Sequence, residues 1–472
     1  MTSLRFLSTE NINALHDTTL EVLDKTGVCF ESEVAQEFLR EAGCIIEGSI
    51  VKIPESLVSR SLEKAPNSFD LYNLEGSESF SIGSDTVIYN PASSAVYFKD
   101  RRTRKIRHGT SEDVKQLVQV VDALDHIKAQ STALIASDVP EAVSDFHRLF
   151  ISLKNSIKPI VTGAFRKDGV PDMIRLLEVI VGDTKTLAKK PVAIFDCCPV
   201  SPLVWSDLSC QNLIDCAESG IPSEIVPAPL MGATSPTTLN GTIVQTNVEV
   251  LSGIVLAQVV SPGAPIIYGG APADFDMKYA TARFGAIESM IVACASSEMG
   301  KHYGVPTHAY IGSSDSKIED AQSGSESALG IILGALARIN IISGPGMLAY
   351  LNCQSLEKLA IDNELCGSAY RLIRGLDLED LEVVADLLST VGPSGNYLGQ
   401  KHTSKRFRDE HFMPSEIICR LTADSWLESG SKSMFDRASE RVDQILKDHT
   451  PEAPDNLKEL EKVYIQLRKE RT

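Results

Sequence analysis

The sequence predicts a (β/α)₈ barrel of the TIM type with an added helical and β-hairpin N-terminal domain. The chain has 472 residues, which is enough for a large barrel plus a further domain. From residue 110 onward, short apolar runs alternate with helical stretches, and this alternation indicates parallel strands joined by right-handed crossovers. Seven or eight such units over about 300 residues fit a closed barrel better than an open sheet.

The predicted N-terminal domain covers residues 1–109. Ile12, Leu15 and Leu23 fall on one face of a first helix, a second helix is expected near Ser32, and Pro54 suits the first turn of a third. Short alternating runs, punctuated by glycine and proline, then predict hairpins. These runs are residues 69–71, 80–82, 87–89 and 96–98.

The predicted barrel covers residues 110–450. Thr110 is placed to cap its first helix, since it precedes Ser-Glu-Asp and an apolar face that begins at Val114. The strand candidates are 127–135, 158–165, 191–197, 224–227, 265–268, 307–312 and 339–343, with an eighth near 397–402 or earlier at 382–385. Leu457, Leu460 and Leu467 have helical spacing in the remaining segment, 451–472, which predicts a C-terminal helix on the barrel or on a neighbouring subunit.

The main rival is a doubly wound nucleotide-binding fold. That fold would carry GxGxxG directly after a strand, or GxxxxGK[ST]. The glycines at 269–270 and 344–346 match neither spacing and indicate tight turns after strands.

Composition excludes several classes of function. The net charge of −18 argues against nucleic-acid binding. The basic run 99–108 is short and is typical of a solvated loop or strand edge. No eighteen apolar residues occur in a row, so no membrane span is expected. The start of the chain lacks the features of a secretory signal, and ten scattered cysteines suit reduced thiols, so we expect a cytoplasmic protein.

No metal bound by the chain itself is expected, because nine histidines are spread singly and no Cys/His pattern has zinc spacing. In a barrel, the chemistry lies at the C-terminal ends of the strands. The segments that follow the predicted strands are rich in small residues, and this indicates a wide opening that suits docking of something large. They include residues 227–236, 268–277, 312–322 and 344–352.

The same segments carry a resemblance to the trimethylamine methyltransferase family. It rests on residues 100–110, 247–253, 269–277, 312–322, 357–364 and 397–403, in order, and it spans most of the chain. The resemblance implies a barrel enzyme that transfers a methyl group from a methylated amine to the cobalt of a separate corrinoid protein. The trimethylamine enzymes carry pyrrolysine in the barrel, whereas this sequence has only standard residues and its sixth strand ends in Ile311-Gly312.

The chain therefore resembles the branch without pyrrolysine, whose substrates are quaternary amines such as glycine betaine, proline betaine and carnitine. No histidine here lies two residues after an aspartate and three before a glycine, so the typical cobalt-ligand pattern is absent. The corrinoid (cobalamin) is therefore expected on a partner protein or free. The partners expected are a small quaternary amine and a corrinoid-binding protein, with no nucleic acid and no membrane. The apolar C-terminal helix makes a homo-oligomer the expected assembly.

A quaternary ammonium has no N–H to donate, so its recognition requires aromatic faces and carboxylates. We expect His402 and Asp315 to act in catalysis. The candidates for substrate binding are Tyr97, Glu249, Tyr268, Phe275, Gly312, Lys317, Tyr350 and Tyr397. The candidates for corrinoid contact are Met231, Gly269, Gly270, Asp320 and Gln322.

Structural roles remain open for several of these residues. Tyr268 and Tyr350 could cap the barrel core, Tyr97 could pack within a hairpin, and Asp320 could cap a helix. Glu249 lies in an apolar helix, where a carboxylate is exposed, paired or functional. His402 could be a hydrogen-bonded structural residue, and Met231 could fill the core. Two other functions stay open, namely a barrel that binds a quaternary amine without catalysis and a metal-dependent barrel hydrolase.

Overall fold

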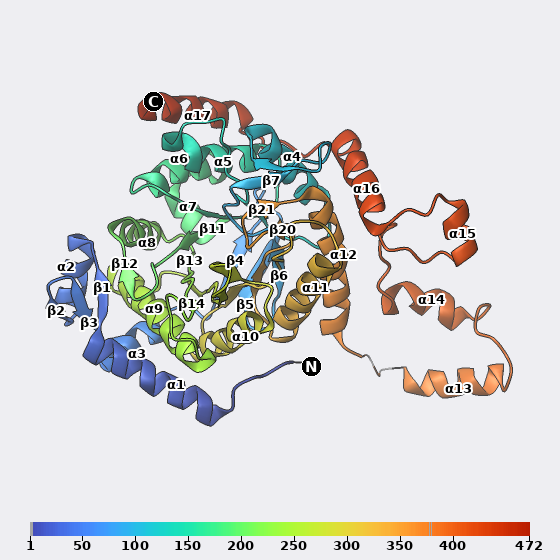
Figure 1. Cartoon of the computed structure of the whole chain (residues 1–472), viewed down its shortest axis with the longest axis horizontal. Helices are drawn as coiled ribbons and strands as arrows, with labels where there is room; N and C mark the ends of the chain where they lie inside the picture. Colours follow the sequence, from blue (N-terminus) through green and yellow to red (C-terminus); the bar gives the residue numbers. More distant parts are fainter. Residues whose placement is uncertain (1–2, 377, 379) are drawn as a thin grey trace.

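The computed structural model describes residues 3–376, 378 and 380–472, and its centre is an eight-stranded parallel barrel inside a ring of helices (Figure 1). Five strands pair in the order β15-β13-β11-β10-β9, and three pair in the order β18-β19-β6. Their bounds are β6 Ile88–Asn90, β9 Gln130–Ser131, β10 Ile160–Gly163, β11 Ala193–Cys197, β13 Ser223–Ile225, β15 Ile266–Tyr268, β18 His308–Tyr310 and β19 Ile341–Ser343.

Backbone hydrogen bonds join the two sheets on both sides and so close the barrel. Tyr268 at the end of β15 forms a parallel bridge with Thr307, and its N–H donates to the Pro306 carbonyl at 2.8 Å. On the other side, the N–H groups of Lys128 and Ala129 donate to the Tyr89 carbonyl at 3.1 and 3.2 Å. The predicted fold class is confirmed.

The prediction of the eighth strand was wrong. Residues 382–385 lie in a helix, and residues 397–402 form a turn that leads into another helix. The missing strand is β6, which precedes residue 109 and pairs in parallel with β19. The apolar spacing of 382–385 is helical, whereas β6 is too short to be told from a hairpin strand by its pattern alone. The barrel therefore begins before the predicted domain limit.

Each barrel strand leads to a helix of the surrounding ring. In strand order the helices are α4 Ser111–Ala123, α5 Ser144–Lys154, α6 Gly169–Val181 with α7 Thr184–Lys189, α8 Asp207–Ser219, α9 Leu239–Val260, α10 Ile287–His302, α11 Ala321–Leu336 and α12 Leu356–Arg374. Thr110 caps α4 through the Asp113 N–H, and the Asp113 side chain accepts in return from Thr110, which confirms the predicted capping box.

The N-terminal region packs against the outside of α8 and α9. It comprises α1 Thr9–Glu21, a π-helical turn Val22–Thr26, β1 Val28–Phe30, α2 Glu33–Glu41, β2 Ile45–Glu47, β3 Ile50–Lys52 and α3 Glu55–Lys64. β1 pairs in parallel with β12, Val204–Trp205. In the described part of the chain, α9 alone is long and apolar enough to cross a membrane, but 78% of its apolar window is buried inside the protein. Its composition is therefore explained by the packing of α1, α3, α8 and α10 around it.

A hairpin closes the N-terminal end of the barrel. Its strands are β4 Ser68–Tyr72 and β5 Ser79–Gly83. Leu71 and Ile82 of this hairpin belong to one buried cluster with residues of β6, β11, β15 and β19 and with the residue that directly precedes β9. Those residues are Ile88, Ala129, Ile194, Ile267 and Ile341. The floor of the barrel is therefore dry, and the polar side chains lie above it.

Two small sheets surround the opposite end, which we call the mouth. One consists of β14 Leu230–Met231, β16 Ala273–Asp276 and β17 Thr281–Arg283. The other has the order β20-β21-β7-β8, with β20 Met347–Leu348, β21 Cys353–Gln354, β7 Tyr97–Lys99 and β8 Ile106–His108. Both sheets are built from segments that follow barrel strands, so they belong to the end where (β/α)₈ enzymes carry their sites.

The segment after α12 leaves the body of the molecule, although it was predicted within the barrel range. It carries α13 Leu381–Val391, α14 Lys401–Glu410 and α15 Ala423–Glu428, which project to the right in Figure 1. We call residues 380–428 the arm. The chain then returns with α16 Met434–Asp448, which packs on α4 and α12, and α17 Leu457–Arg471, which packs on α5 and α6.

Candidate active site

Every second residue of a barrel strand points into the barrel. The inward-facing residues nearest the floor are apolar, and those above them are polar and form a polar layer. Residues two positions after the apolar floor point to the same interior. In β11 Asp196 follows Ile194, in β6 Asn90 follows Ile88, and in β19 Ser343 follows Ile341. Glu224 of β13 is the register partner of Asp196 and joins this layer. The polar layer thus contains two adjacent carboxyl groups.

Asp196 is held by two hydroxyl groups. Its Oδ2 accepts from Ser93 Oγ at 2.9 Å and from the Tyr310 hydroxyl at 3.1 Å, and these two hydroxyls lie 2.7 Å apart. Asp196 Oδ1 is buried and has no hydrogen-bond partner. The side chain is only partly enclosed, so it can meet a ligand that enters from the mouth.

Glu224 is fully buried, and neither of its carboxyl oxygens has a hydrogen-bond partner. Burial, followed by the nearby charge of Asp196, raises the pKa of Glu224 well above its usual range. A buried carboxyl group beside a second acid favours its neutral form in a low-dielectric interior.

His308 and Tyr310 complete the polar layer from β18. His308 Nδ1 lies 3.8 Å from Glu224 Oε2, and its Nε2 lies 2.9 Å from Ser343 Oγ, which in turn bonds the Asn90 amide. Burial lowers the pKa of His308 to about 4, so the ring is neutral at neutral pH. The site therefore contains acids, hydroxyls and a neutral imidazole, but no cationic side chain faces Glu224 at ion-pair distance in the described residues.

The loop that carries Ser93 is locally strained and is fixed from behind. Ala92 and Ser94 both have φ of 68°, a left-handed conformation that costs a residue with a side chain about 1 kcal/mol or more. Arg148 of α5 is fully buried, and its guanidinium donates to the Thr132 carbonyl at 2.8 Å and to Ser94 Oγ at 3.4 Å. Arg148 thus holds the loop that presents Ser93 to Asp196.

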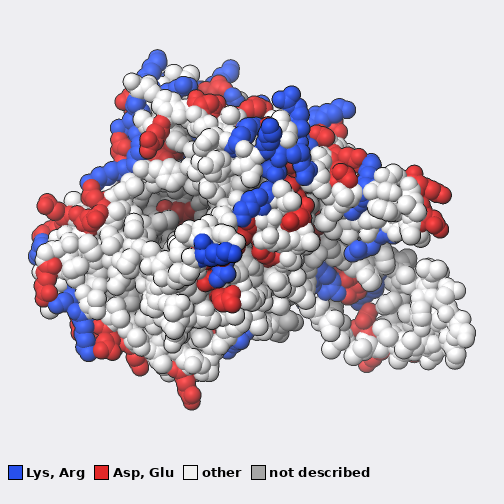
Figure 2. Space-filling model, viewed as in Figure 1, with Lys and Arg blue, Asp and Glu red and all other residues white. Residues whose placement is uncertain are grey.

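A small cation is the ligand that this arrangement lacks. A buried carboxylate without a partner costs several kcal/mol, and a cation beside it offsets that cost. Figure 2 shows a hollow inside the ring of helices with acidic atoms in its depth. Within the described residues, no group of three or more His, Cys, Asp or Glu side chains is arranged to hold a metal ion.

Three of the predicted residues meet at the mouth. Lys317 Nζ lies 2.6 Å from the Tyr350 hydroxyl and 4.0 Å from the centre of its ring, and it also donates to the Asp315 carbonyl. The Asp315 carboxylate accepts from the N–H groups of Phe284 and Gly285 at 3.1 and 3.0 Å. Burial raises the pKa of Asp315 to about 6. Asp315 therefore anchors the segment that leads into α10.

Other predicted residues surround this mouth cluster in structural roles. Tyr97 of β7 packs on His108 within its hairpin, with ring centres 4.9 Å apart. Phe275 lies half-buried in β16, and a side chain at Gly312 would meet Pro345. Asp320 caps α11 by accepting from the Ser323 N–H. The exposed Gln322 donates to Glu326 at 2.9 Å.

Glu249, Tyr268 and Met231 lie outside the polar layer. Glu249 accepts from Ser201 Oγ and from the Leu203 N–H, both at 2.8 Å, and so holds the loop after β11. Tyr268 points outward and donates to Asn247 of α9 at 3.0 Å. Met231 is buried in β14.

Gly269 and Gly270 are explained by close packing after β15. A Cβ at Gly269 would approach the Ile225 carbonyl at 2.6 Å and His308 Nδ1 at 3.1 Å. A Cβ at Gly270 would meet Pro272 at 3.3 Å. The glycines thus allow the backbone to pass beside the polar layer.

His402 and Tyr397 lie on the arm. His402 Nε2 is 3.2 Å from Asp380 Oδ2, which is itself an arm residue, and Tyr397 is exposed. Figure 1 shows this part of the chain beyond the ring of helices. The structure therefore does not bring His402 together with Asp315, its predicted partner in catalysis.

Sequence reasoning missed Asp196, Glu224, His308 and Tyr310 as site residues. Glu224 was detectable, because a lone acid within an apolar strand must be paired or functional. His308 and Tyr310 are two apart in a predicted strand, which places both on one face. Ser93 could not be identified from the sequence, because β6, the strand before its loop, was not recognised as part of the barrel.

Comparison with known proteins supplies the last observations. The sequence pattern of the family described as trimethylamine methyltransferase matches residues 1–472. A trimethylamine methyltransferase of Desulfitobacterium hafniense is 31% identical over 447 residues, which cover 94% of this chain and 90% of that protein. A glycine betaine methyltransferase of strain Y51 of the same species is 30% identical over 453 residues, which cover 95% of this chain and 94% of that protein.

A solved structure of the Methanosarcina barkeri monomethylamine methyltransferase superposes with a TM-score of 0.51 at 12% identity, and the match covers 92% of each chain. A crystal structure of the hydroxylamine complex of MtmB gives the same TM-score and identity over 98% of this chain and 91% of that one. At this identity the likeness concerns the fold alone.

Proposed function

The chain belongs to the trimethylamine methyltransferase family and is a methyltransferase, and from this premise we propose that it moves a methyl group from a small quaternary amine of the betaine type to the Co(I) of a corrinoid. Glycine betaine, proline betaine and carnitine are the candidate substrates. We propose that the corrinoid arrives on a partner protein or free.

One observation carries the proposal, namely the unpaired Glu224 carboxyl beside Asp196 in the barrel interior. A quaternary ammonium cannot donate a hydrogen bond, so it is held by charge and by aromatic faces. The pair of Asp196 and Glu224 has no cationic side chain at ion-pair distance from Glu224 among the described residues, so it is open to one ammonium. The Tyr310 ring lies beside it, since its hydroxyl bonds Asp196.

The reaction needs little acid–base help from the protein. The methyl carbon exchanges its bond to nitrogen for a bond to cobalt, and the electron pair of the broken C–N bond stays on nitrogen as a neutral tertiary amine. No proton is needed at that step. The residues of this chain therefore serve to hold the cation, aim one methyl group at the mouth and exclude water. The dry floor below the polar layer leaves the mouth as the direction of approach.

The mouth suits a large acceptor. Exposed apolar side chains occur in several segments that follow the barrel strands, and such patches mark interaction sites. They include Phe165, Val200, Met277, Tyr279 and Ile318. We also propose a cytoplasmic location, which the ten free cysteines support.

The test is anaerobic methylation of cob(I)alamin by the purified protein, followed by absorbance, with glycine betaine, proline betaine, carnitine, choline and trimethylamine in parallel. We expect methylcobalamin to form with one betaine and not with trimethylamine. Turnover of trimethylamine alone would reject the betaine assignment. No turnover with any of the five, where a known methyltransferase works, would reject the proposal as stated.

A matched pair of variants locates the site. Glu224→Gln keeps the shape of the side chain but cannot ionise when the cation binds, so we expect the affinity for the substrate to fall by about 2 kcal/mol or more, roughly thirtyfold. Glu461→Gln on α17 makes the same change in a partly exposed carboxylate that pairs with Lys154 on the outer surface, and it should leave affinity unchanged. Equal affinities in the two variants would remove Glu224 from the site.

A further inference from the structure

The arm exposes an unusual amount of apolar surface. Among the described residues, α13, α14 and α15 bury none of their side chains. The arm nevertheless carries nine of the 24 exposed large apolar side chains found among the described residues. They include Leu381, Val383, Leu388, Leu398, Phe407 and Leu427. Surfaces of this kind mark interaction sites.

α13 presents this surface as two neighbouring stripes. Leu381, Ala385 and Leu388 follow the i, i+4, i+7 spacing of one helical face, and all three are exposed. Glu382 and Asp386 form the stripe beside it, and in the described structure neither carboxylate has an ion-pair partner. α13 contains no lysine or arginine. Its outer face is therefore both apolar and acidic.

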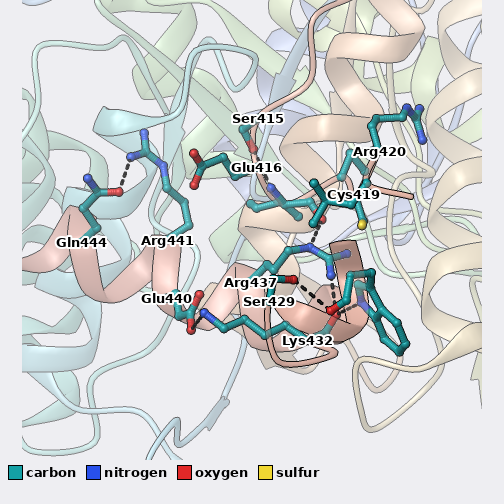
Figure 3. A pocket seen from close by; sticks show the side chains of 14 residues that line it. Ser415, Glu416, Cys419, Arg420, Ser429, Lys432, Arg437, Glu440, Arg441 and Gln444 are labelled. Carbon is teal, nitrogen blue, oxygen red and sulfur yellow. Dashed lines mark hydrogen bonds and ion pairs between the residues drawn. The ribbon is translucent and has the colours of Figure 1, made fainter. Parts of the chain in front are cut away.

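A cavity of about 830 Å³ at the base of the arm has the opposite character (Figure 3). It lies between segment 415–421, which contains a turn, and α15 and α16. Its apolar lining comes from Ile417, Ile418, Leu421 and Trp426, and its charged lining consists of Arg420, Lys432, Arg437 and Arg441 with only Glu416 and Glu440. Cations thus outnumber anions, although the whole chain carries a net charge of −18.

Two of these cations have no carboxylate partner in the described structure. Arg441 bonds only the Gln444 amide oxygen, at 3.0 Å, and no hydrogen bond or ion pair joins Arg420 to another side chain. Lys432 pairs with Glu440 at 2.6 Å, and Arg437 donates to the backbone carbonyl groups of Ile417 and Lys432. Arg420 and Arg441 are therefore available to an acidic partner.

We propose that this cavity receives α13 of a second copy of the chain, so that two copies exchange their arms about a twofold axis. The acidic stripe would then meet Arg420 and Arg441, while Leu381 and Leu388 would contact the apolar lining. The chain's own α13 does not line the cavity and lies at the far end of the arm in Figure 1. Because one chain carries both surfaces, a twofold pair satisfies both at once.

The first test is the mass of the purified full chain in solution, measured by light scattering during size-exclusion chromatography. We expect a dimer or a multiple of one. Leu388→Glu should halve the mass, and Ile465→Glu, an equally exposed position on α17, should not. A monomeric wild-type chain overturns the proposal, and so does a Leu388→Glu chain that keeps the mass of the wild type.

Charge reversal tests the pairing itself. Asp386→Arg and Arg441→Glu should each weaken association at least tenfold, and the double variant should recover most of the loss, because the two charges then attract again. Circular dichroism of each variant checks that it is folded. A dimer that is indifferent to all three variants places the contact elsewhere. A monomer that binds a corrinoid protein only through an intact arm assigns the arm to that partner instead. Either result overturns the proposal.

Discussion

Glu224 combines a functional role with a cost to the fold. Its carboxyl is fully buried without a hydrogen-bond partner, which is a feature that packing alone would not maintain. A buried polar group without a hydrogen-bond partner is expected mainly at functional sites. The same residue therefore permits two independent measurements, one on stability and one on binding.

Glu224→Gln should raise the stability of the free protein at neutral pH. The pKa of Glu224 is raised in the folded state, so between its ordinary value of about 4.3 and the folded value the unfolded chain has already lost the proton that the folded chain keeps. Wild-type stability from this group therefore falls as pH rises through that window, and glutamine removes the loss. Thermal unfolding from pH 5 to 8 should show a melting temperature for the variant that increasingly exceeds that of the wild type. A lower value at pH 8 would contradict the assigned state of Glu224.

Binding of the quaternary ammonium should release a proton. A cation beside Glu224 favours its ionised form and lowers its pKa toward the ordinary range. Affinity should therefore increase with pH, up to the pKa of Glu224 in the free protein. Calorimetry in two buffers with different ionisation enthalpies measures the protons released. Their number should be greater than zero for the wild type and close to zero for Glu224→Gln, and equal values would show that another group titrates.

At the scale of the element, the β4–β5 hairpin contributes to the stability of the barrel and not to the candidate site. Leu71 and Ile82 pack against the apolar floor of the barrel, and in β6, β11 and β19 the polar layer begins one inward-facing residue higher. The hairpin therefore contributes to the closed end of the barrel without contacting the candidate site.

Ile82→Ala should destabilise the protein by about 2–5 kcal/mol, because it leaves a cavity among branched side chains. Urea unfolding measures the change. Substrate affinity of the folded fraction should remain that of the wild type. Ile45→Ala, at an exposed position in β2, is the control and should change stability by less than about 0.5 kcal/mol. An Ile82→Ala protein with altered affinity but normal stability would place the hairpin in the site.

At the scale of the whole molecule, the C-terminal helix α17 stabilises the barrel. α17 buries Leu460, Tyr464 and Leu467 against α5 and α6, and the Tyr464 hydroxyl bonds His147 at 2.7 Å. Arg471 pairs with the buried Asp172 at 2.8 Å. Of the two predicted places for this helix, the barrel and a neighbouring subunit, the structure shows contacts with the barrel helices.

Removal of residues 457–472 should cost several kcal/mol. Each of the three buried side chains contributes about 1.5–3 kcal/mol, and Asp172 loses one of its two arginine partners. We expect a lower melting temperature and aggregation through the exposed faces of α5 and α6. The control is Ile465→Ala, which alters the solvent side of the same helix. A truncated chain that melts with the wild type would show that α17 docks only weakly.

The sequence by itself determined the barrel, because a period of two in the strands and near 3.6 in the helices is a local property. Seven of the eight strands, the cap at Thr110 and the apolar C-terminal helix all follow from spacing within a few residues. The mouth residues Asp315, Lys317 and Tyr350 were also accessible, since the order of strand and loop assigns them to one end of the barrel.

Only the tertiary structure decided where the ring closes and what lies inside it. β6 is three residues long and pairs with β19 some 250 residues later. Closure brings Ser93 to Asp196 and places Glu224 beside it, and it leaves His402 on the arm with Asp380. Local spacing specifies which face a side chain occupies, but the partner of a buried charge depends on contacts between distant segments.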